Sequence, residues 1–96
     1  MEKQYYLYMM TNKYNNVLYV GVTNDIKRRV LEHRQGVVDG FTKKYNCHKL
    51  VWFEQYSDIR LAIEKEKTIK NWRREYKNNL INAMNPQWDD LSNDFV

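Results

Sequence analysis

The chain has 96 residues, of which 43% are hydrophobic and 29% charged, with one proline and three glycines. These values are typical of one globular domain and exclude a disordered or collagen-like chain. No stretch approaches the roughly 18 apolar residues of a membrane span, and the N-terminus lacks a signal-peptide pattern. The single cysteine, Cys47, excludes an internal disulfide and a cysteine-rich zinc site. We therefore expect a cytoplasmic protein.

The charge is unevenly distributed along the chain. The net charge is +4, and residues 1–56 carry nine Lys and Arg against five acidic residues, whereas residues 57–96 carry seven of each. From about residue 87 the chain forms an acidic tail with Asp89, Asp90 and Asp94 and no basic residue. A moderate basic excess favours a polyanionic partner such as nucleic acid, although an ordinary solvated surface explains it equally well.

The first 23 residues have the pattern of a β-hairpin. Residues 5–10 are apolar on both faces, which is typical of a strand covered on both sides. Residues 11–16 are rich in Asn and predict a turn. Residues 17–23 alternate, so that Leu18, Val20 and Val22 face one way and Tyr19, Gly21 and Thr23 the other. A glycine inside a strand often marks a place where a ligand or another backbone comes close.

A helix and a third strand follow the hairpin. Asn24 or Asp25 is predicted to cap a helix that ends near Gln35, before Gly36. Residues 36–47 are predicted to form a loop. The segment Lys49 to Tyr56 is rich in Val, Trp, Phe and Tyr and predicts a strand.

The rest of the chain is predicted to be helical. Ser57 or Asp58 caps a helical region that continues to Met84, is broken or bent near Asn71 and ends before Pro86. The resulting order, ββαβαα, predicts an α/β (α+β) fold in which a small three-stranded, mainly antiparallel sheet is flanked by helices. We expect residues 1–96 to form a single domain.

Glu66 interrupts the apolar stripe of the second helical region. Ile59, Ala62, Ile63 and Ile69 form this stripe, and Glu66 lies four residues after Ala62 and three before Ile69. A carboxylate there must be paired, protonated or bound to a cation, because burying an uncompensated charge is costly. Two readings fit: a boundary glutamate bonded to a neighbouring Tyr or Arg, or a ligand of Mg²⁺, which uses one or two carboxylates and several waters.

Other polar residues have both a structural and a functional reading. Tyr8 and Tyr19 are predicted on neighbouring strands, where packing is the usual role of a phenol ring. Arg29 and His33 are four residues apart on one helix face, which suits either a solvated surface or a phosphate clamp with a titratable partner. The basic and aromatic segment from Phe41 to Tyr45 suits phosphates and base stacking, although such segments are common.

The combination of these residues resembles the GIY-YIG endonuclease superfamily. Tyr6-Leu7-Tyr8 is followed after eleven residues by Tyr19-Val20-Gly21, and then by Arg29, His33 and Glu66. The likeness covers nearly the whole chain and is closest to small single-domain bacterial members, which have similar segments at Gly40–Tyr45, His48–Val51 and Asn85–Trp88. One departure is that Tyr6 stands where the name of the superfamily has Gly.

The resemblance implies a role for each matching residue. Glu66 would hold one divalent metal ion per site, Mg²⁺ or Mn²⁺, and Tyr8 and Tyr19 would surround the attacking water and the scissile phosphate. Arg29 would bind phosphate oxygens and His33 would assist proton transfer, with Gly21 and Asn85 in supporting positions. The residues expected to bind nucleic acid are Lys27, Arg28, Arg34, Lys43, Lys44 and Tyr45.

The resemblance thus predicts a metal-dependent endonuclease that hydrolyses phosphodiester bonds of nucleic acid, with DNA as the expected form and DNA repair as the expected setting. We expect Tyr8, Tyr19, Arg29, His33 and Glu66 to converge on one concave surface, and placing Glu66 and Tyr19 on opposite faces of the sheet would contradict this site. Two alternatives remain: a catalytically silent nucleic-acid-binding module, and an adaptor that binds a partner through Trp72, Tyr76 and Trp88. The sequence leaves the oligomeric state open.

Overall fold

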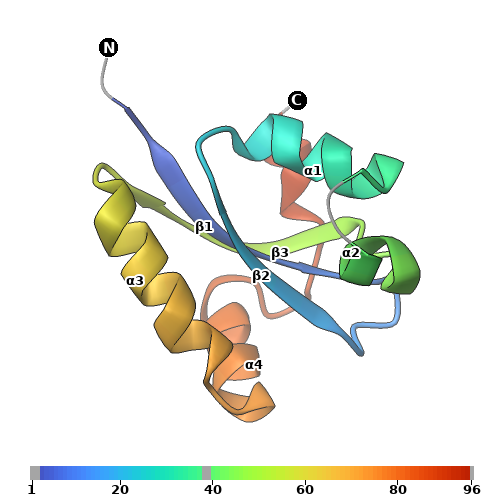
Figure 1. Ribbon diagram of the computed structural model, residues 1–96. Coiled ribbons are helices and arrows are strands. Elements are labelled where there is room, and N and C mark those ends of the chain that lie inside the picture. The colour runs from blue at the N-terminus through green and yellow to red at the C-terminus, as the bar shows by residue number, and fades with distance from the viewer. Residues whose placement is uncertain (1–2, 38–39, 96) are drawn as a thin grey trace.

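In a computed structural model, three antiparallel strands form one sheet with helices on both faces (Figure 1). The structure describes residues 3–37 and 40–95, with the backbone alone for residues 94 and 95. The elements are β1 (Tyr5–Thr11), β2 (Leu18–Thr23), α1 (Ile26–Gln35), α2 (Gly40–Tyr45), β3 (Lys49–Tyr56), α3 (Ile59–Lys70), α4 (Arg74–Met84) and the 3₁₀ helix η1 (Leu91–Phe95). This confirms the predicted α+β fold class. The strand order is β2-β1-β3, so that β1 is central and β2 and β3 form the two edges of the sheet.

The hairpin register fixes which residues of β1 and β2 face each other. Tyr8 lies opposite Gly21, and Met10 lies opposite Tyr19. The turn between the strands has the expected Asn chemistry, since Asn15 adopts a positive φ of 56° and donates its backbone N–H to the Asn12 carbonyl at 3.1 Å. The alternation predicted for residues 17–23 is confirmed: Val20 and Tyr19 join hydrophobic clusters on opposite faces of the sheet.

The long helices begin and end at the predicted signals. The Asp25 carboxylate accepts a hydrogen bond from the Arg28 N–H at the start of α1, and Gly36 ends this helix with a φ of 72°. Asp58 caps α3 in the same way, and Asn71 ends it. The predicted break or bend near Asn71 is a break, because α3 ends at Lys70 and α4 begins at Arg74.

The predicted loop over residues 36–47 is wrong for part of its length, because Gly40–Tyr45 form the short helix α2. Residues 38 and 39 of the predicted loop lie outside the described part of the chain. Thr42 is fully buried, and its carbonyl accepts a hydrogen bond from the Cys47 N–H at 3.0 Å. The burial of Thr42 and this hydrogen bond stabilise a helix that is too short to be read from the sequence pattern.

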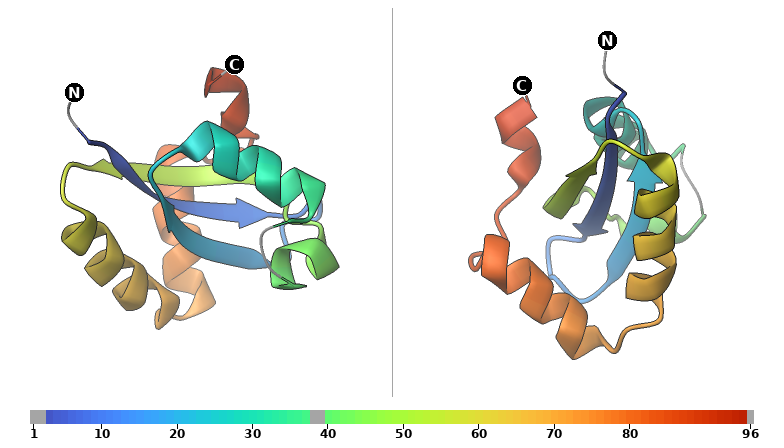
Figure 2. Two further views of the ribbon diagram at one scale, coloured as in Figure 1. Left: turned by 45° about the horizontal axis from the view of Figure 1, so that its top comes forward. Right: turned by 90° about the vertical axis from the view of Figure 1, so that its left-hand side faces the viewer.

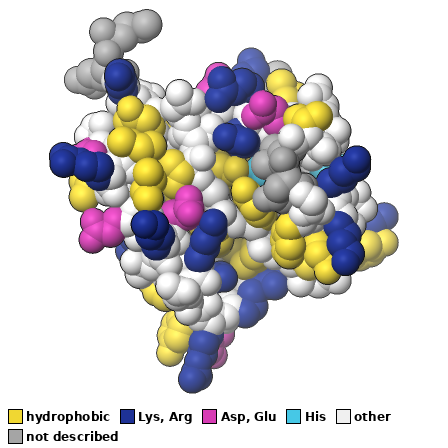
Figure 3. Space-filling model, viewed as in Figure 1, with side chains coloured by type: hydrophobic (Ala, Val, Ile, Leu, Met, Phe, Trp, Pro, Cys, Tyr) yellow, Lys and Arg dark blue, Asp and Glu magenta, His cyan; other side chains and the backbone are white. Residues whose placement is uncertain are grey.

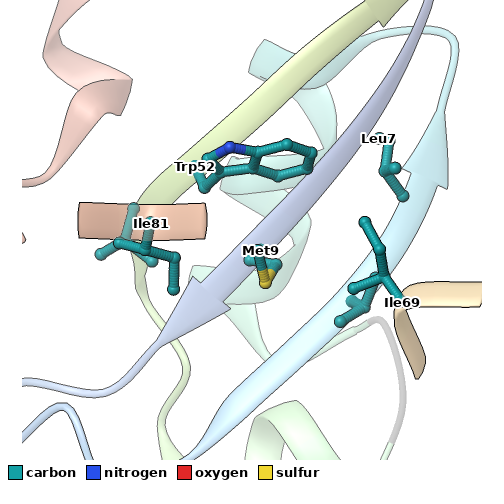
Figure 4. Close-up of a cluster of buried hydrophobic side chains, with 7 residues drawn as sticks. Leu7, Met9, Trp52, Ile69 and Ile81 are labelled. Carbon is teal, nitrogen blue, oxygen red and sulfur yellow. The ribbon is translucent and has the colours of Figure 1, made fainter. Parts of the chain in front are cut away.

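Helices cover both faces of the sheet (Figure 2), and a hydrophobic cluster lies on each face. The α3–α4 face contains Leu7, Met9, Val20, Val51, Trp52, Ile69 and Ile81 (Figure 4). The α1 face contains Tyr8, Met10, Ile26, Val30, Cys47 and Leu50. An irregularity in the β1–β3 pairing between Met9 and Met10 places the successive residues Val51 and Trp52 in the same cluster.

The predicted acidic tail is folded against the domain. The Asp90 carboxylate accepts a hydrogen bond from Arg34 at 2.6 Å and another from the Leu50 N–H at 3.2 Å. The side chain of Asp94 lies outside the described part. The tail therefore neutralises a cation of α1 instead of extending into solvent. In the portion of the chain that is described, no helix has the length and apolar character needed to cross a bilayer.

Candidate active site

A buried hydrogen bond joins Tyr8 of β1 to His33 of α1. The Tyr8 hydroxyl lies 2.8 Å from His33 Nε2, and the tautomer of the imidazole decides which of the two groups donates. Both side chains are buried. The contact forms because Tyr8 faces α1 from the central strand, while His33 belongs to the buried stripe of α1 with Ile26 and Val30. It couples a phenol and an imidazole, two groups able to exchange a proton.

Tyr19 lies against this pair from the edge strand β2. Its ring centroid is 6.1 Å from that of Tyr8 and 5.0 Å from that of His33, and its side chain is half-buried. Tyr19 is therefore the more accessible of the two tyrosines. The pairing of β1 with β2 confirms the prediction that both phenols lie on adjacent strands.

Gly21 provides the space into which the Tyr8 side chain extends. A Cβ at position 21 would lie 2.6 Å from the Tyr8 hydroxyl oxygen and 3.0 Å from a ring carbon of Tyr19. The position of Gly21 inside a strand predicts the close approach of a ligand or another backbone. In the structure, the approaching group is the tyrosine hydroxyl itself.

Arg29 stands one helical turn before His33. Its side chain is 31% exposed, and within the described residues its Nε atom is buried without a hydrogen bond. The Glu32 carboxylate lies 3.8 Å from this atom and 3.9 Å from Nε of Arg28. Glu32 is not among the predicted site residues, although its spacings of three and four residues from these arginines indicate such contacts. The Arg29 guanidinium keeps hydrogen-bonding capacity for an anion.

Glu66 comes from the helix on the other face of the sheet. Its side chain is 20% exposed, and its carboxylate forms an ion pair with Lys70 at 3.0 Å. Ala62 and Ile69 of the predicted stripe are buried, but Ile63 is 40% exposed, so the buried stripe is narrower than predicted. The structure thus brings Tyr8, Tyr19 and His33 together, with Arg29 one turn away. Glu66 comes from α3, which packs through Ile69 on the other face of the sheet.

Edge strand β2 lies between these two groups of residues. In Figure 1, β2 runs in front of β1, with α3 on one side and α1 and α2 on the other. Helix α3 packs mainly against β1 and β2. A carboxylate on α3 can therefore approach the phenol and imidazole groups only around the outer edge of β2. The predicted convergence on one concave surface remains a prediction.

The side chains present fit one kind of cation site. Within the described residues, no group of three or more His, Cys, Asp or Glu side chains is placed to hold a metal ion. One partly exposed carboxylate, Glu66, matches Mg²⁺ or Mn²⁺ bound through a single protein ligand and several waters. The exposed ion pair with Lys70 is a weak competitor, because such pairs contribute little free energy.

The residues predicted to bind nucleic acid fall into two groups. Lys27, Arg28, Lys43, Lys44 and Tyr45 are exposed on α1 and α2. Arg34, in contrast, donates hydrogen bonds to Asp90, Ser92 and the His48 carbonyl, which argues against the predicted phosphate contact at this residue. In Figure 3, Lys and Arg side chains are scattered among acidic and apolar ones on the face that shows β2, and no single basic patch forms.

A row of aromatic rings runs from the Tyr8–His33 pair along α2. The Phe41 ring lies 6.4 Å from that of Tyr19 and 4.8 Å from that of Tyr45. We call Tyr19, Phe41 and Tyr45 the aromatic row. Phe41 and Tyr45 are exposed, so two rings of the row are open to a ligand.

Asn85 holds the C-terminal segment to the sheet. Its amide donates hydrogen bonds to the carbonyls of Val51 at 3.1 Å and Asp89 at 2.8 Å, and its carbonyl accepts the Asp89 N–H. The side chain is buried at the edge of β3, on the opposite edge of the sheet from β2. Any supporting role of Asn85 acts through the position of this segment.

Comparison with known proteins gives a consistent family. The family model described as the GIY-YIG catalytic domain matches residues 4–82. The chain is 34% identical over 80 residues to a UPF0213 protein of Haloquadratum walsbyi, covering 83% of this chain and 89% of that protein. It is 33% identical over 78 residues to a UPF0213 protein of Clostridium perfringens, covering 81% and 83%.

A solved structure has the same fold. The solution NMR structure of a UPF0213 protein from Bacillus halodurans matches with a TM-score of 0.58 and 23% identity, covering 91% of this chain and 92% of that chain. The family match, the identities above and the tyrosines of β1 and β2 agree. The chain belongs to the GIY-YIG catalytic domain family, and this membership implies a nuclease-type function on nucleic acid.

Proposed function

We propose that this protein is an endonuclease that hydrolyses phosphodiester bonds of nucleic acid, with DNA as the expected substrate and one divalent cation as cofactor. The observation that carries this proposal is the buried hydrogen bond between Tyr8 and His33, covered by Tyr19 and one helical turn from Arg29. Phosphodiester hydrolysis needs a proton acceptor, a cation for the phosphate oxygens and a positioned water molecule. These residues supply the first two requirements directly.

The phosphate is proposed to lie across the outer edge of β2. There Arg29 would donate hydrogen bonds to the non-bridging oxygens, whose charge grows in the transition state. The Arg29 side chain is 31% exposed, so its guanidinium can reach an anion, and within the described residues its Nε has no hydrogen bond to lose. Glu32 would keep the guanidinium on this side of α1 until the phosphate arrives.

The proton from the attacking water is proposed to pass to the tyrosine and histidine groups. The water oxygen forms a bond to phosphorus while the bond from phosphorus to the leaving sugar oxygen breaks. Tyr19, the more accessible phenol, would orient the water, and the Tyr8–His33 pair would receive its proton. The leaving oxygen takes a proton from solvent, which balances the reaction.

Glu66 is the residue proposed to hold the divalent cation. Such a cation supplies neutralisation of phosphate charge and a lowered pKa of bound water. Its binding requires the carboxylate to leave Lys70, which costs little at a partly exposed site.

Two specific observations support rival functions. The ion pair of Glu66 with Lys70, on a helix that packs on the face of the sheet opposite Tyr19, favours a catalytically silent nucleic-acid-binding module. A hollow of about 510 Å³ lined by Trp72, Tyr76 and Leu80 favours a partner-binding adaptor. Trp88 does not line this hollow, because its indole donates a hydrogen bond to Asn82 and packs against the α3–α4 cluster.

A cleavage panel tests the proposal. Labelled single-stranded, double-stranded and branched DNA and RNA are incubated with Mg²⁺ or Mn²⁺, beside Glu66→Ala and a sample with EDTA. We expect cleavage that needs both the cation and Glu66. Binding without cleavage on every substrate would support the silent module, and neither binding nor cleavage would support the adaptor.

A further inference from the structure

A second hollow lies away from the Tyr8–His33 pair. It has a volume of about 460 Å³ and lies where the β1–β2 turn, the end of α2 and the start of β3 meet. Its lining includes Lys13, Tyr14, Tyr45, Asn46, His48 and Lys49. The volume is within the range of small-ligand sites, about 300–1,000 Å³.

The charges of this hollow favour an anion. Within residues 3–37 and 40–93, Lys13 and Lys49 form no ion pair, so their charges are available to a ligand. Arg34 and Asp90 also line the hollow but neutralise each other through their contact of 2.6 Å. The net charge presented by the described side chains is therefore positive.

The rings of this hollow favour a planar group. Tyr14 is 70% exposed although it is a large aromatic residue, and Tyr45 is 38% exposed. Burying such rings against a ligand removes apolar surface from water, and every nucleobase offers a matching π-face. Asn46 and His48 add hydrogen-bonding groups at the rim.

The aromatic row connects this hollow to the candidate active site. Tyr45 belongs to both, and ring contacts of 4.8 Å and 6.4 Å lead from it through Phe41 to Tyr19. Arg34, which follows His33 on α1, also lines the hollow. A strand whose phosphate lies at Tyr19 can therefore pass over exposed rings into the hollow.

We propose that this hollow binds one unpaired nucleotide unit, with its base stacked on Tyr14 or Tyr45 and its phosphate at Lys13 and Lys49. The unit is either a free nucleotide or part of the strand that is cleaved, and the second source rests on the proposed function. A base held in a pair cannot enter the hollow, so the strand must be unpaired at this point.

Two measurements test the site and separate its two sources. In the first, adenosine 5′-monophosphate is titrated into isotope-labelled protein, and amide shifts are followed at residues 45–49 by NMR. In the second, a labelled single strand and the matching duplex are bound in EDTA, and fluorescence anisotropy gives their affinities. Tyr14→Ala, Tyr45→Ala and the double variant Lys13→Ala with Lys49→Ala are compared with the exposed controls Tyr76→Ala and Lys67→Ala.

We expect the variant that removes the stacking ring, Tyr14→Ala or Tyr45→Ala, to weaken single-strand binding about 5- to 150-fold. The double lysine variant removes the contact with one phosphate, so it should lower the magnitude of the salt slope by about 0.7. The controls should bind as the wild type does. Thermal unfolding confirms that each variant is folded.

Each outcome separates the hollow from the proposed function. If adenosine 5′-monophosphate shifts the amides of the wild type but the variants bind the single strand as tightly as the wild type does, the hollow binds a free nucleotide. Wild-type binding of mononucleotide and strand by all pocket variants would overturn the site while leaving the nuclease proposal standing. If no substrate is cleaved in any assay but adenosine 5′-monophosphate still shifts the amides, the nuclease proposal is overturned and the nucleotide site stands.

Discussion

The hydroxyl of Tyr8 occupies the space that a side chain at Gly21 would need: a Cβ there would lie 2.6 Å from the hydroxyl oxygen and 2.7 Å from the ring carbon that carries it. The two residues face each other across the β1–β2 register. Gly21 does not have a positive φ, so its requirement is steric and not conformational. The glycine therefore controls where the Tyr8 hydroxyl meets His33.

Gly21→Ala should displace the Tyr8 side chain and lower both activity and stability. Overpacking of this kind typically costs about 1–3 kcal/mol of unfolding free energy. Gly40→Ala is the matched control, because nothing lies within 4 Å of a Cβ at that position. Chemical denaturation and a cleavage assay check the pair, and equal stability of the two variants would show that Tyr8 moves aside without cost.

Removal of single hydroxyl groups should separate chemistry from packing. Tyr19→Phe keeps the ring contacts with Tyr8 and His33 and should retain nucleic-acid binding while losing turnover. Tyr8→Phe also removes the buried hydrogen bond to His33, so it should lose about 1 kcal/mol of stability as well. Rates at saturating substrate, compared with unfolding free energies, distinguish the two. Full turnover in both variants would remove the phenols from the mechanism.

Arg29→Ala should reduce the cleavage rate about 10²–10³-fold, the usual cost of losing a preorganised donor to transition-state charge. Arg73→Ala, an exposed arginine before α4, serves as the control for net charge. Single-turnover rates with each variant provide the comparison. Equal rates for the two variants would mean that Arg29 contributes only through the net positive charge of the protein.

Glu66→Gln should abolish cleavage supported by Mg²⁺ or Mn²⁺ and leave the fold intact. An amide retains the shape of the carboxylate but holds a hard cation poorly. The lost ion pair with Lys70 is a partly exposed surface pair worth about 0–1 kcal/mol. Glu64→Gln, on the exposed side of the same helix, is the control. If the Glu66→Gln variant unfolds, or cleaves as fast as the wild type, this glutamate is structural.

Acid pH should weaken the attachment of the C-terminal segment. Burial alone would raise the pKa of Asp90, but hydrogen bonds from Ser92 and the Leu50 N–H and the charge of Arg34 together hold it below its ordinary value. A lowered pKa in the folded state stabilises the protein above the unfolded-state value, about 3.9, and this contribution disappears as pH falls through the folded value.

Asp90→Asn should therefore destabilise the protein at pH 7, by about 1–3 kcal/mol. The difference from the wild type should be constant above about pH 5 and should shrink as the pH drops below about 4. Denaturant unfolding across this pH range measures it. A difference that does not change with pH would mean that the ionised state of Asp90 makes no contribution.

Local signals in the sequence were sufficient for most of the fold. The caps at Asp25 and Asp58, the positive φ at Gly36 and the alternation around Val20 each act within a few residues, so they can be read from the chain. Helix α2 could not be predicted, because its six residues are too few to show a helical period, although Thr42 is buried in it.

The candidate site was predictable in part for the same reason. The resemblance predicted that Tyr8 and His33 share one site, but the burial of His33 in the apolar stripe of α1 was not predicted. The hydrogen bond of Arg34 to Asp90 joins residues 56 positions apart and could not be predicted from local patterns. The phase of Glu66 on its helix was predicted, whereas the face of the sheet on which α3 packs was not. Helical periodicity specifies a buried stripe and not the surface that covers it.

The C-terminal segment also determines how far the chain can be shortened. The family match ends at residue 82, before Asn85 and Asp90 bind the Val51 carbonyl and the Leu50 N–H on edge strand β3. A chain limited to residues 4–82 would retain Tyr8, Tyr19, Arg29, His33 and Glu66 but leave these backbone groups open. Uncovered edge strands are templates for pairing with other chains. Such a shortened chain is expected to aggregate, and its inactivity would then say nothing about its catalytic residues.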